Sequence, residues 1–337
     1  MPSLDTLGRP MRDLRISVTD RCNFRCSYCM PLDEYKWIER QQVLSFEEIE
    51  RLVRLFLDFG IEKVRLTGGE PLVRRDLHRL IARLAGVPSL SDISLTTNGA
   101  LLAEQADALY TAGLRRINVS IDTLNKDRFT ALTKRGNLDD VLSGLFAAKR
   151  VGMSPIKLNA VIIRGTNDDE ILPLVEFARS NGFEMRFIEY MDVGNVNAWI
   201  LEKTVTKKEI VETVHARFPV REVGRAHGSA PAVDYEFIDG AGEIGIIGSV
   251  TEPFCSSCTR VRLTADGKLV TCLFAESGFD LKSLIRAGAS DDEICTQVAK
   301  IWSGRTDRYS DIRWQQVRSG TYEARDHKKI EMITLGG

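Results

Sequence analysis

The sequence has almost no net charge, few histidines and no long apolar run. Its 337 residues carry 46 lysines and arginines against 47 aspartates and glutamates, a net charge of −1. A nearly neutral chain creates no field that recruits nucleic acid or a membrane, so anions must be bound by a few local arginines. No run approaches the roughly 18 apolar residues of a spanning helix, and the N-terminal MPSLDTLGRPMRDLR has no apolar signal core. We therefore expect a cytoplasmic protein.

Histidines and cysteines are both scarce, but only the cysteines are grouped. The four histidines lie apart and near no motif, which gives no support to a histidine-based triad or metal site. Six of the seven cysteines fall in two tight groups, and Cys295 stands alone in a helical stretch where it is expected to pack in the core. In a reducing compartment, such groups are expected to be metal ligands or catalytic thiols rather than disulfides.

A repeated strand–helix pattern runs from residue 14 to about residue 192. Six such units predict a parallel sheet with helical crossovers, whose functional edge lies at the carboxyl ends of the strands. A full eight-fold barrel and an open doubly wound sheet are alternatives, but the pattern changes after six units. We therefore predict an α/β fold with a partial (βα)6 TIM-type barrel. The strands are expected at 14–20, 63–70, 92–99, 115–122, 156–165 and 184–192.

Beyond residue 200 the alternation is lost. We therefore expect a barrel over residues 1–200 and a C-terminal α+β extension over residues 201–337. The segments YEFI, IGIIGSV and VRLTADGKLVTCLF are expected to be short antiparallel strands, the last with a turn at Asp266-Gly267. In the barrel, Ser45 and Glu48 predict a capping box at the start of the first long helix.

The first cysteine group has the spacing C-x3-C-x2-C and lies on the loop after the first expected strand. It consists of Cys22, Cys26 and Cys29. Structural zinc takes four ligands, and a [4Fe–4S] cluster normally takes four thiolates. Three thiolates would leave one iron with an open coordination position, which is what a catalytic metal retains.

The second cysteine group, Cys255, Cys258 and Cys272, again has three members. Its C-x2-C start is common in zinc ribbons, so zinc is a stronger alternative here, although the fourth cysteine of a ribbon is missing. Arg260 and Arg262 lie within this group, and alternate residues of a strand face the same side. Two guanidinium groups beside a metal would suit a phosphate-rich substrate, whereas elsewhere they would be read as solvated arginines.

The first cysteine group, with Tyr28 before its last member and a GGEP turn at residues 68–71, resembles the radical S-adenosylmethionine superfamily. Longer motifs resemble the GTP 3′,8-cyclase family, which opens molybdenum cofactor (molybdopterin) biosynthesis. These motifs are LGRPMRDLRISVTDRCNFRCSYCMP, TGGEPLVRRDL, LTTNG, RRINVSID, RFIEYMDVG, CSSCTRVRLTADGKLVTCLF and the terminal Gly-Gly. The resemblance extends from residue 8 to residue 337 and is weakest over 195–250.

The resemblance implies a reaction and its cofactors. It implies two [4Fe–4S] clusters, one on each cysteine group. The first would bind S-adenosylmethionine at its open iron and cleave it to a 5′-deoxyadenosyl radical, and the second would hold guanine. The radical would abstract the 3′ hydrogen of GTP, C3′ would bond to C8, and reduction and protonation of the resulting aminyl radical would give (8S)-3′,8-cyclo-7,8-dihydroguanosine 5′-triphosphate.

The resemblance also implies site residues and partners. It places S-adenosylmethionine contacts on Tyr28, Gly69, Ser120 and Met191. It places GTP contacts on Arg15, Arg65, Thr96, Lys157, Arg260, Val261 and Arg262. It gives catalytic roles to Arg260, Arg262, Gly336 and Gly337. The implied partners are an electron donor of the flavodoxin or ferredoxin type, a second copy of the chain in a homodimer, and cyclic pyranopterin monophosphate synthase, which takes the product.

Two other classes are alternatives. A twin-cluster radical enzyme that modifies peptides would usually carry about seven cysteines near its C-terminus, where this chain has three after residue 250 apart from Cys295. A non-catalytic iron–sulfur or zinc regulator would need neither inward arginines nor a GGE turn. Two four-iron clusters would give about eight irons per chain, whereas a regulator would hold one or two zinc ions.

Overall fold

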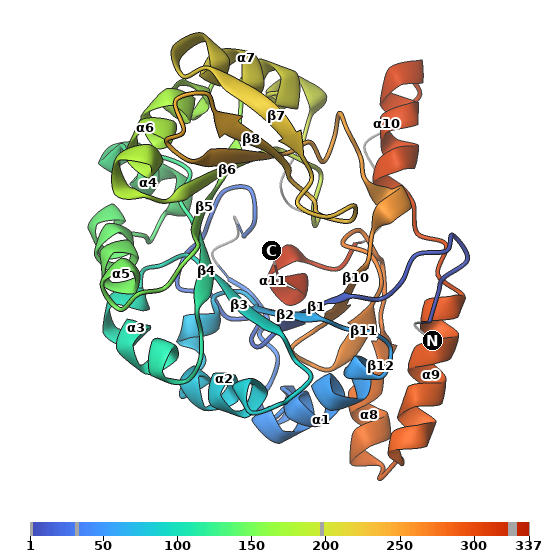
Figure 1. Cartoon of the computed structure of the whole chain (residues 1–337). Coiled ribbons are helices and arrows are strands. Elements are labelled where there is room, and N and C mark those ends of the chain that lie inside the picture. The colour runs from blue at the N-terminus through green and yellow to red at the C-terminus, as the bar shows by residue number, and fades with distance from the viewer. Residues whose placement is uncertain (1–2, 31–33, 196–198, 323–328, 337) are drawn as a thin grey trace.

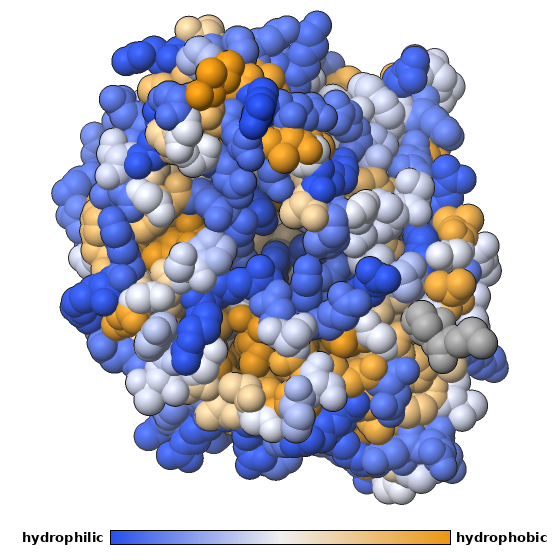
Figure 2. All heavy atoms as spheres, viewed as in Figure 1, coloured by the Kyte–Doolittle hydropathy of each residue, from blue (hydrophilic) through white to orange (hydrophobic). Residues whose placement is uncertain are grey.

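The computed structural model describes residues 3–30, 34–195, 199–322 and 329–336. Its strands follow one another around a central space, and most of its helices lie outside them (Figure 1). On the same face the surface is hollowed at the centre of the ring, and hydrophilic side chains surround the hollow (Figure 2). Across the described ranges, no helix combines the length and the apolar character needed to cross a membrane.

Six parallel strands form the middle of the sheet, each paired with the next along the chain. All six expected strands are present, and each ends two or three residues earlier than expected, where the functional turn begins. They are β1 (Asp13–Ser17), β2 (Lys63–Thr67), β3 (Asp92–Thr97), β4 (Arg116–Ser120), β5 (Ile156–Ile162) and β6 (Glu184–Glu189). The α/β partial barrel is therefore confirmed.

Helices connect these strands across the outside of the sheet, because each has one apolar face that must be buried. In the first helix Ile49, Leu52, Val53 and Phe56 are buried, at the spacing of one helical face. The connecting helices are α1 (Phe46–Leu57), α2 (Leu77–Ala85), α3 (Leu102–Thr111), α4 (Lys126–Thr133), α5 (Leu138–Arg150) and α6 (Ile171–Asn181). Short 3-10 turns lie at Arg40–Gln42, Pro71–Val73, Asp168–Glu170, Leu201–Lys203 and Cys255–Ser257.

Alternation along the strands decides which side chains face the central space. In β1, Leu14 and Ile16 are fully buried in the apolar core, and Arg15 lies between them. Since successive side chains of a strand point to opposite faces, Arg15 faces the interior of the ring. The same pattern in β2 puts Arg65 on the interior side between Val64 and Leu66. The interior of the ring is therefore polar and cationic at this level.

The C-terminal region extends the same sheet at both ends. β9 (Glu243–Ile247) pairs parallel with β6, and β10 (Arg260–Leu263) pairs parallel with β1. We expected only short antiparallel strands here; that is right for the β8–β9 and β10–β11 pairs but incomplete. The parallel pairs cover the two edges of the six-strand sheet, whose backbone groups would otherwise be unpaired. The remaining strands are β7 (Val220–Gly224), β8 (Val233–Phe237), β11 (Lys268–Val270) and β12 (Phe279–Asp280).

The resulting sheet has 12 strands in the order β12-β11-β10-β1-β2-β3-β4-β5-β6-β9-β8-β7. The last helix lies inside the ring of strands, whereas the preceding ones lie outside it (Figure 1). The C-terminal helices are α7 (Lys207–Arg217), α8 (Leu281–Arg286), α9 (Asp291–Ser303), α10 (Tyr309–Ser319) and α11 (Met332–Leu335). The chain thus returns to the central space after forming its outer wall.

The predicted capping box at the start of α1 is present. The Ser45 hydroxyl accepts from the Glu48 amide at 3.1 Å, and the Glu48 carboxylate accepts from the Ser45 amide at 2.7 Å. Ser45→Ala removes one partner of this pair, so we expect the free energy of unfolding to fall by about 1 kcal/mol. Urea denaturation measures the change. Ser89→Ala, in an exposed turn, is the control and is expected to cost less than about 0.5 kcal/mol; equal losses in the two variants would contradict the cap assignment.

Candidate active site

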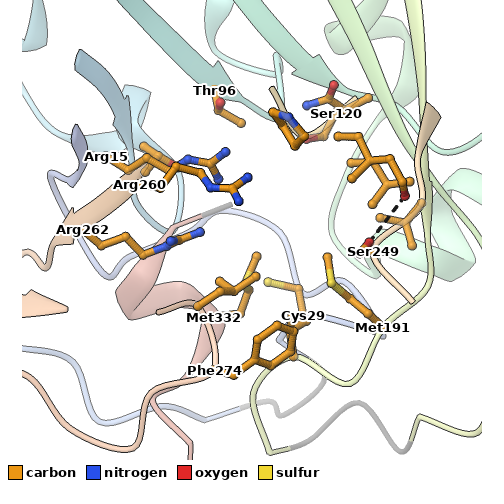
Figure 3. A pocket seen from close by; sticks show the side chains of 18 of the residues that line it. Arg15, Cys29, Thr96, Ser120, Met191, Ser249, Arg260, Arg262, Phe274 and Met332 are labelled. Carbon is orange, nitrogen blue, oxygen red and sulfur yellow. Dashed lines mark hydrogen bonds between the residues drawn. The ribbon is translucent and has the colours of Figure 1, made fainter. Parts of the chain in front are cut away.

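A cavity of about 310 Å³ lies inside the ring, and all six grouped cysteines line it. Its wall also includes residues that follow β2, β4 and β6, where the strands end. Figure 3 shows Arg15, Arg260 and Arg262 pointing into this space from one side, with Thr96 and Ser120 on another and Cys29, Met191 and Phe274 below them. We call this cavity the chamber. The two cysteine groups, more than 200 residues apart in sequence, therefore face one shared volume.

A smaller cavity of about 160 Å³ adjoins the chamber near the starts of the strands. The two cavities share the side chains of Arg15, Arg65, Arg186, Pro231 and Arg260. The smaller cavity is further lined by several cations, two carboxylates and a histidine: Lys63, Arg116, Lys157, Asp13, Asp234 and His227. We call it the basic pocket. Four shared guanidinium groups thus stand between the chamber and the basic pocket.

The first cysteine group lies on a loop whose backbone is held by hydrogen bonds at both ends of the group. The amides of Cys29 and Met30 donate to the Cys26 carbonyl at 3.1 and 2.8 Å. The Phe24 amide donates to the Cys22 sulfur at 3.4 Å. Burial raises the pKa of Cys22 to about 11 and that of Cys29 to about 12. Without a bound cation, these thiols are neutral at pH 7.

The GGE turn after β2 is pressed against the cysteine loop. The Gly69 amide donates to the Thr19 carbonyl at 2.8 Å, and a β-carbon on Gly69 would lie 2.4 Å from the Arg21 carbonyl oxygen. Only glycine allows this approach of two backbones. The Glu70 carboxylate accepts from Leu72 and Asn98 amides and the Thr97 hydroxyl at 2.7–3.0 Å. Burial raises the pKa of Glu70 to about 7.

The residues expected to contact S-adenosylmethionine all line the chamber. Tyr28, Gly69, Ser120 and Met191 come from four different turns or strand ends. The Tyr28 hydroxyl donates to the Asp122 carboxylate at 2.6 Å, which joins the cysteine loop to the turn after β4. Burial raises the pKa of Asp122 to about 6. The tertiary structure therefore brings this predicted set to the wall of one chamber.

The second cysteine group receives hydrogen bonds on its sulfurs and carbonyls. Arg260 Nε and Arg305 Nη2 each donate to the Cys258 sulfur at 3.3 Å, and the Phe274 amide approaches the Cys272 sulfur at 3.5 Å. Burial alone would raise the pKa of the Cys258 thiol, but the two guanidinium groups outweigh burial and lower it to about 6. The thiolate form of Cys258 is therefore favoured.

These residues fit iron–sulfur clusters in donor type and surroundings. Among the described residues, no three His, Cys, Asp or Glu side chains converge on the position of a single metal ion. The donors of each group are three thiols facing the same chamber, and cluster thiolates typically accept hydrogen bonds that adjust the potential of the metal centre. The N–H···S contacts at Cys22, Cys258 and Cys272 are of this kind. Either group can thus supply three thiolates to a cluster.

Three inward-facing arginines, Arg262 buried and Arg15 and Arg65 partly buried, form a row across adjacent strands. In the strand register Arg15 is the direct neighbour of Arg262 on β10 and of Arg65 on β2. Neighbouring strands lie about 4.8 Å apart, so like charges in register repel one another. Burial and the surrounding guanidinium groups lower the pKa of Arg15 well below its usual value, and burial lowers the pKa of Arg65 and Arg262 to about 10. We call these residues the arginine row.

The arginine row lacks a full set of partners within the described residues. Arg65 Nε donates to the Ser94 hydroxyl at 3.3 Å, but the buried Arg262 Nε has no hydrogen-bond partner there. An unpaired buried cation costs several kcal/mol. A polyanion in the chamber or the basic pocket would remove that cost. The geometry therefore matches a phosphate-rich ligand.

The other expected GTP contacts lie at different places in the site. Thr96 lines the chamber, whereas Lys157 lines the basic pocket and forms an ion pair with Glu184. The Val261 side chain is fully buried in the apolar core, as expected between two inward-facing arginines. The Val261 side chain therefore faces away from the chamber, and only the backbone of Val261 lies on the strand that borders the chamber.

The C-terminal segment reaches the chamber from inside the ring. Met332 lines the cavity, and Figure 3 shows its side chain beside those of Arg262 and Cys29. Gly336 has φ +71°, and a β-carbon there would lie 2.2 Å from Thr67 Cγ2. The position is therefore restricted to glycine by both conformation and space. Gly337, the other terminal glycine to which we assign a catalytic role, lies outside the described residues.

Several residues at the site carried no recognisable signal in the sequence. Asn159 is an example: it lines the chamber, and its buried Oδ1 has no hydrogen-bond partner among the described residues. Arg9 and Arg305 hold the second cysteine group, but each is separated from it by long stretches of chain. The alternation of β5 puts Asn159 at an inward position, and this feature could have indicated that it belongs to the site. Nothing in the local sequence indicates Arg9 or Arg305.

Two family models match the chain. The model described as the radical SAM superfamily matches residues 16–178, and the model described as Molybdenum Cofactor Synthesis C matches residues 183–311. The chain is 46% identical to GTP 3′,8-cyclase of Acidothermus cellulolyticus over 100% of this chain and 99% of that protein. It is 47% identical to GTP 3′,8-cyclase of Xanthomonas axonopodis pv. citri, with the same coverage.

Solved structures are similar at a much lower identity. SuiB of Streptococcus suis bound to precursor peptide SuiA has a TM-score of 0.62 and 15% sequence identity, covering 92% of this chain and 67% of that one. SuiB bound to S-adenosylmethionine has a TM-score of 0.58 at 15% identity, covering 90% and 68%. At this identity the likeness shows the fold alone.

The contact between Gly336 and Thr67 predicts how the C-terminal segment responds to substitution. Gly336→Ala would strain the backbone and create a clash, with a cost of roughly 1–3 kcal/mol. We expect opening of residues 329–336 to become about 5- to 150-fold more frequent, as measured by hydrogen exchange.

Gly320→Ala is the matched control, because Gly320 has the same φ of +71° with nothing within 4 Å of the added carbon. It should leave exchange at residues 329–336 unchanged. Adding Thr67→Ala to Gly336→Ala should partly restore protection, since it removes the two closest atoms of the clash. Unaltered exchange in Gly336→Ala would contradict the docking described above.

Proposed function

This chain belongs to the GTP 3′,8-cyclase family, radical S-adenosylmethionine enzymes of molybdenum cofactor biosynthesis, and we propose which of its residues hold each reactant. The enzyme uses S-adenosylmethionine and iron–sulfur chemistry to cyclise GTP. The observation that carries the assignment is the shared chamber, which both cysteine groups line and which the arginines Arg15 and Arg65 connect to the basic pocket.

We propose that the triphosphate lies against the arginine row and extends into the basic pocket. A triphosphate carries about four negative charges, and a nearly neutral protein needs a local cluster of cations to bind it. Arg15, Arg65 and Arg260 line both cavities, and Lys157 lies deeper in the basic pocket. This arrangement directs the guanine and ribose towards the chamber. Thr96 and the backbone at Val261 complete the proposed GTP contacts.

S-adenosylmethionine is proposed to occupy the side of the chamber next to the first cysteine group. The GGE turn at Gly69 would receive the amino group of its methionine, Ser120 its carboxylate or ribose, and Met191 its adenine. Tyr28 is fixed by its hydrogen bond to Asp122, so it can help to orient the cofactor without moving. All four residues line the chamber that also holds the first cysteine group, which supports this assignment.

Both reactants would then react within one enclosed volume. Clusters on Cys22, Cys26 and Cys29 and on Cys255, Cys258 and Cys272 would supply, when bound, the electron that cleaves S-adenosylmethionine and an open iron for the guanine edge. The chain's own residues orient GTP and limit the entry of water. Met332 lines the chamber from the C-terminal side, and Gly336 packs against Thr67; this segment would protect a carbon radical from solvent.

The remaining assignments are also proposals. Residues 1–200 would generate the radical, and residues 201–337 would hold the second cluster and part of the GTP site. The partners are an electron donor of the flavodoxin or ferredoxin type and a second copy of the chain in a homodimer. The product would pass to cyclic pyranopterin monophosphate synthase in the cytoplasm.

The direct test is anaerobic incubation of the reconstituted protein with GTP, S-adenosylmethionine and dithionite. We expect 5′-deoxyadenosine and a cyclised nucleotide, both detected by mass spectrometry. Formation of 5′-deoxyadenosine without any cyclised nucleotide would count against GTP as the substrate.

Arg260→Ala and Arg262→Ala should each abolish cyclisation, because each removes a cation from the wall that faces GTP. Iron content should remain at about eight per chain, since neither residue is a metal ligand. Arg221→Ala is the control: this strand arginine has a side chain that is 75% exposed, and its loss should leave turnover unchanged. Normal product formation in both Arg260→Ala and Arg262→Ala would contradict the assignment of these residues to the GTP site.

Lys157→Met should weaken GTP binding while leaving S-adenosylmethionine binding unchanged. Loss of one charge-assisted contact to phosphate should raise the KM for GTP by roughly 10- to 100-fold. Steady-state kinetics measures the effect, with Lys126→Met, an exposed lysine paired with Asp139, as control. A KM that does not differ between the two variants would remove Lys157 from the phosphate site.

A further inference from the structure

We infer that Arg305 is a positioning residue of the second cysteine group: it holds the Cys258 sulfur and sets the reduction potential of the cluster there. This inference rests on the proposed function, because that function places a cluster on Cys255, Cys258 and Cys272. It adds a residue to which neither the motifs nor the comparisons assign a role.

The Arg305 guanidinium contacts Cys258 at two atoms. Arg305 Nη1 donates to the Cys258 carbonyl at 2.8 Å, and Nη2 lies 3.3 Å from the sulfur. Only 4% of Arg305 is exposed, and its guanidinium lies 4.7 Å from the centre of the Trp302 ring. The side chain is therefore held in one orientation, with an N–H group fixed on the sulfur.

A network of buried charges keeps Arg305 in place. Its Nε donates to Asp307 at 3.2 Å, and its Nη1 also lies 3.4 Å from Asp5. Asp5 pairs with Arg9, which in turn donates to the carbonyls of Cys255 and Asp307 at 2.7 and 2.8 Å. Hydrogen bonds from segments at both ends of the chain thus fix the short turn that carries Cys255 and Cys258. The network fixes the position of the sulfur donors as well as the charge beside them.

Arg260 is the other donor to the same sulfur, but its position differs from that of Arg305. Arg260 lines both the chamber and the basic pocket, where it faces the proposed GTP site. Arg305 lines the chamber but not the basic pocket, and it is bound to carboxylates on its other side. If GTP draws Arg260 away from Cys258, Arg305 keeps one N–H···S bond in place. The contribution of this N–H···S bond to the potential of the second cluster would then be retained when substrate binds.

The test compares Arg305→Met, Arg305→Lys and the wild-type holoenzyme. Removing a cation and an N–H···S bond destabilises the reduced cluster, so the midpoint potential should fall. EPR-monitored redox titration measures both clusters, and the first serves as the internal reference. A chain with Cys22→Ala, Cys26→Ala and Cys29→Ala assigns the signal of the second cluster. Arg318→Met, at an exposed arginine, is the control for loss of one charge.

We expect the potential of the second cluster to fall in Arg305→Met, to fall less in Arg305→Lys, and to stay unchanged in Arg318→Met. Adding GTP should shift it more in Arg305→Met than in the wild type. An unchanged potential in Arg305→Met with about eight irons retained would overturn the inference.

If Arg305→Met loses iron, Arg260→Lys labelled with ¹⁵N-arginine decides, because Arg260, the other donor to the Cys258 sulfur, is then absent. Pulsed EPR of the reduced second cluster should then show an arginine nitrogen coupling that persists with GTP bound, and absence of that coupling overturns the inference. Failure of the GTP assignment would look different: GTP would shift the potential in neither protein, while the fall caused by Arg305→Met would remain.

Discussion

The arginine row is the constraint on which the site depends. Arg262, Arg15 and Arg65 stand in register on three adjacent parallel strands, so their Cα atoms cannot move apart without breaking the sheet. Burial and mutual repulsion both lower the pKa of Arg15. Desolvation and mutual repulsion of these guanidinium groups lower the stability of the fold, and a bound polyanion would remove that cost. This cost supports the proposal of a phosphate-rich ligand, because a ligand without phosphates would leave the buried Arg262 Nε unpaired.

The sheet explains why this row exists at all. Six strands alone would place Arg15 at an exposed edge, with Arg65 as its one arginine neighbour. The return of the C-terminal region as β10 covers that edge and supplies Arg262, while β9 covers the opposite edge at β6. The pairing that satisfies backbone hydrogen bonds therefore also completes the site. Because the second cysteine group flanks β10, the same pairing carries it to the chamber.

Two kinds of contact hold the cysteines. The first group depends on backbone fit, because Gly69 allows the GGE turn to touch the cysteine loop. The second group depends on charge, through Arg9 and Arg305 on its carbonyls and on the Cys258 sulfur. The difference matches the proposed roles. One group has to admit a cofactor closely, whereas the other has to keep its electronic surroundings steady while a charged substrate enters.

The sequence alone determined the local and the motif-level features. Six strand–helix units follow from hydrophobic periodicity, the α1 cap from Ser45 and Glu48, and both cysteine groups from spacing, because each of these is encoded within a few residues. Alternation along a strand also predicted that Arg260 and Arg262 face one side, whereas the burial of the Val261 side chain in the core became visible only in the structure. Only the tertiary structure decided that β9 and β10 join the parallel sheet, that Arg305 reaches Cys258, and that Asn159 and Met332 line the chamber. These facts depend on pairing between segments far apart in the chain, which local periodicity does not record.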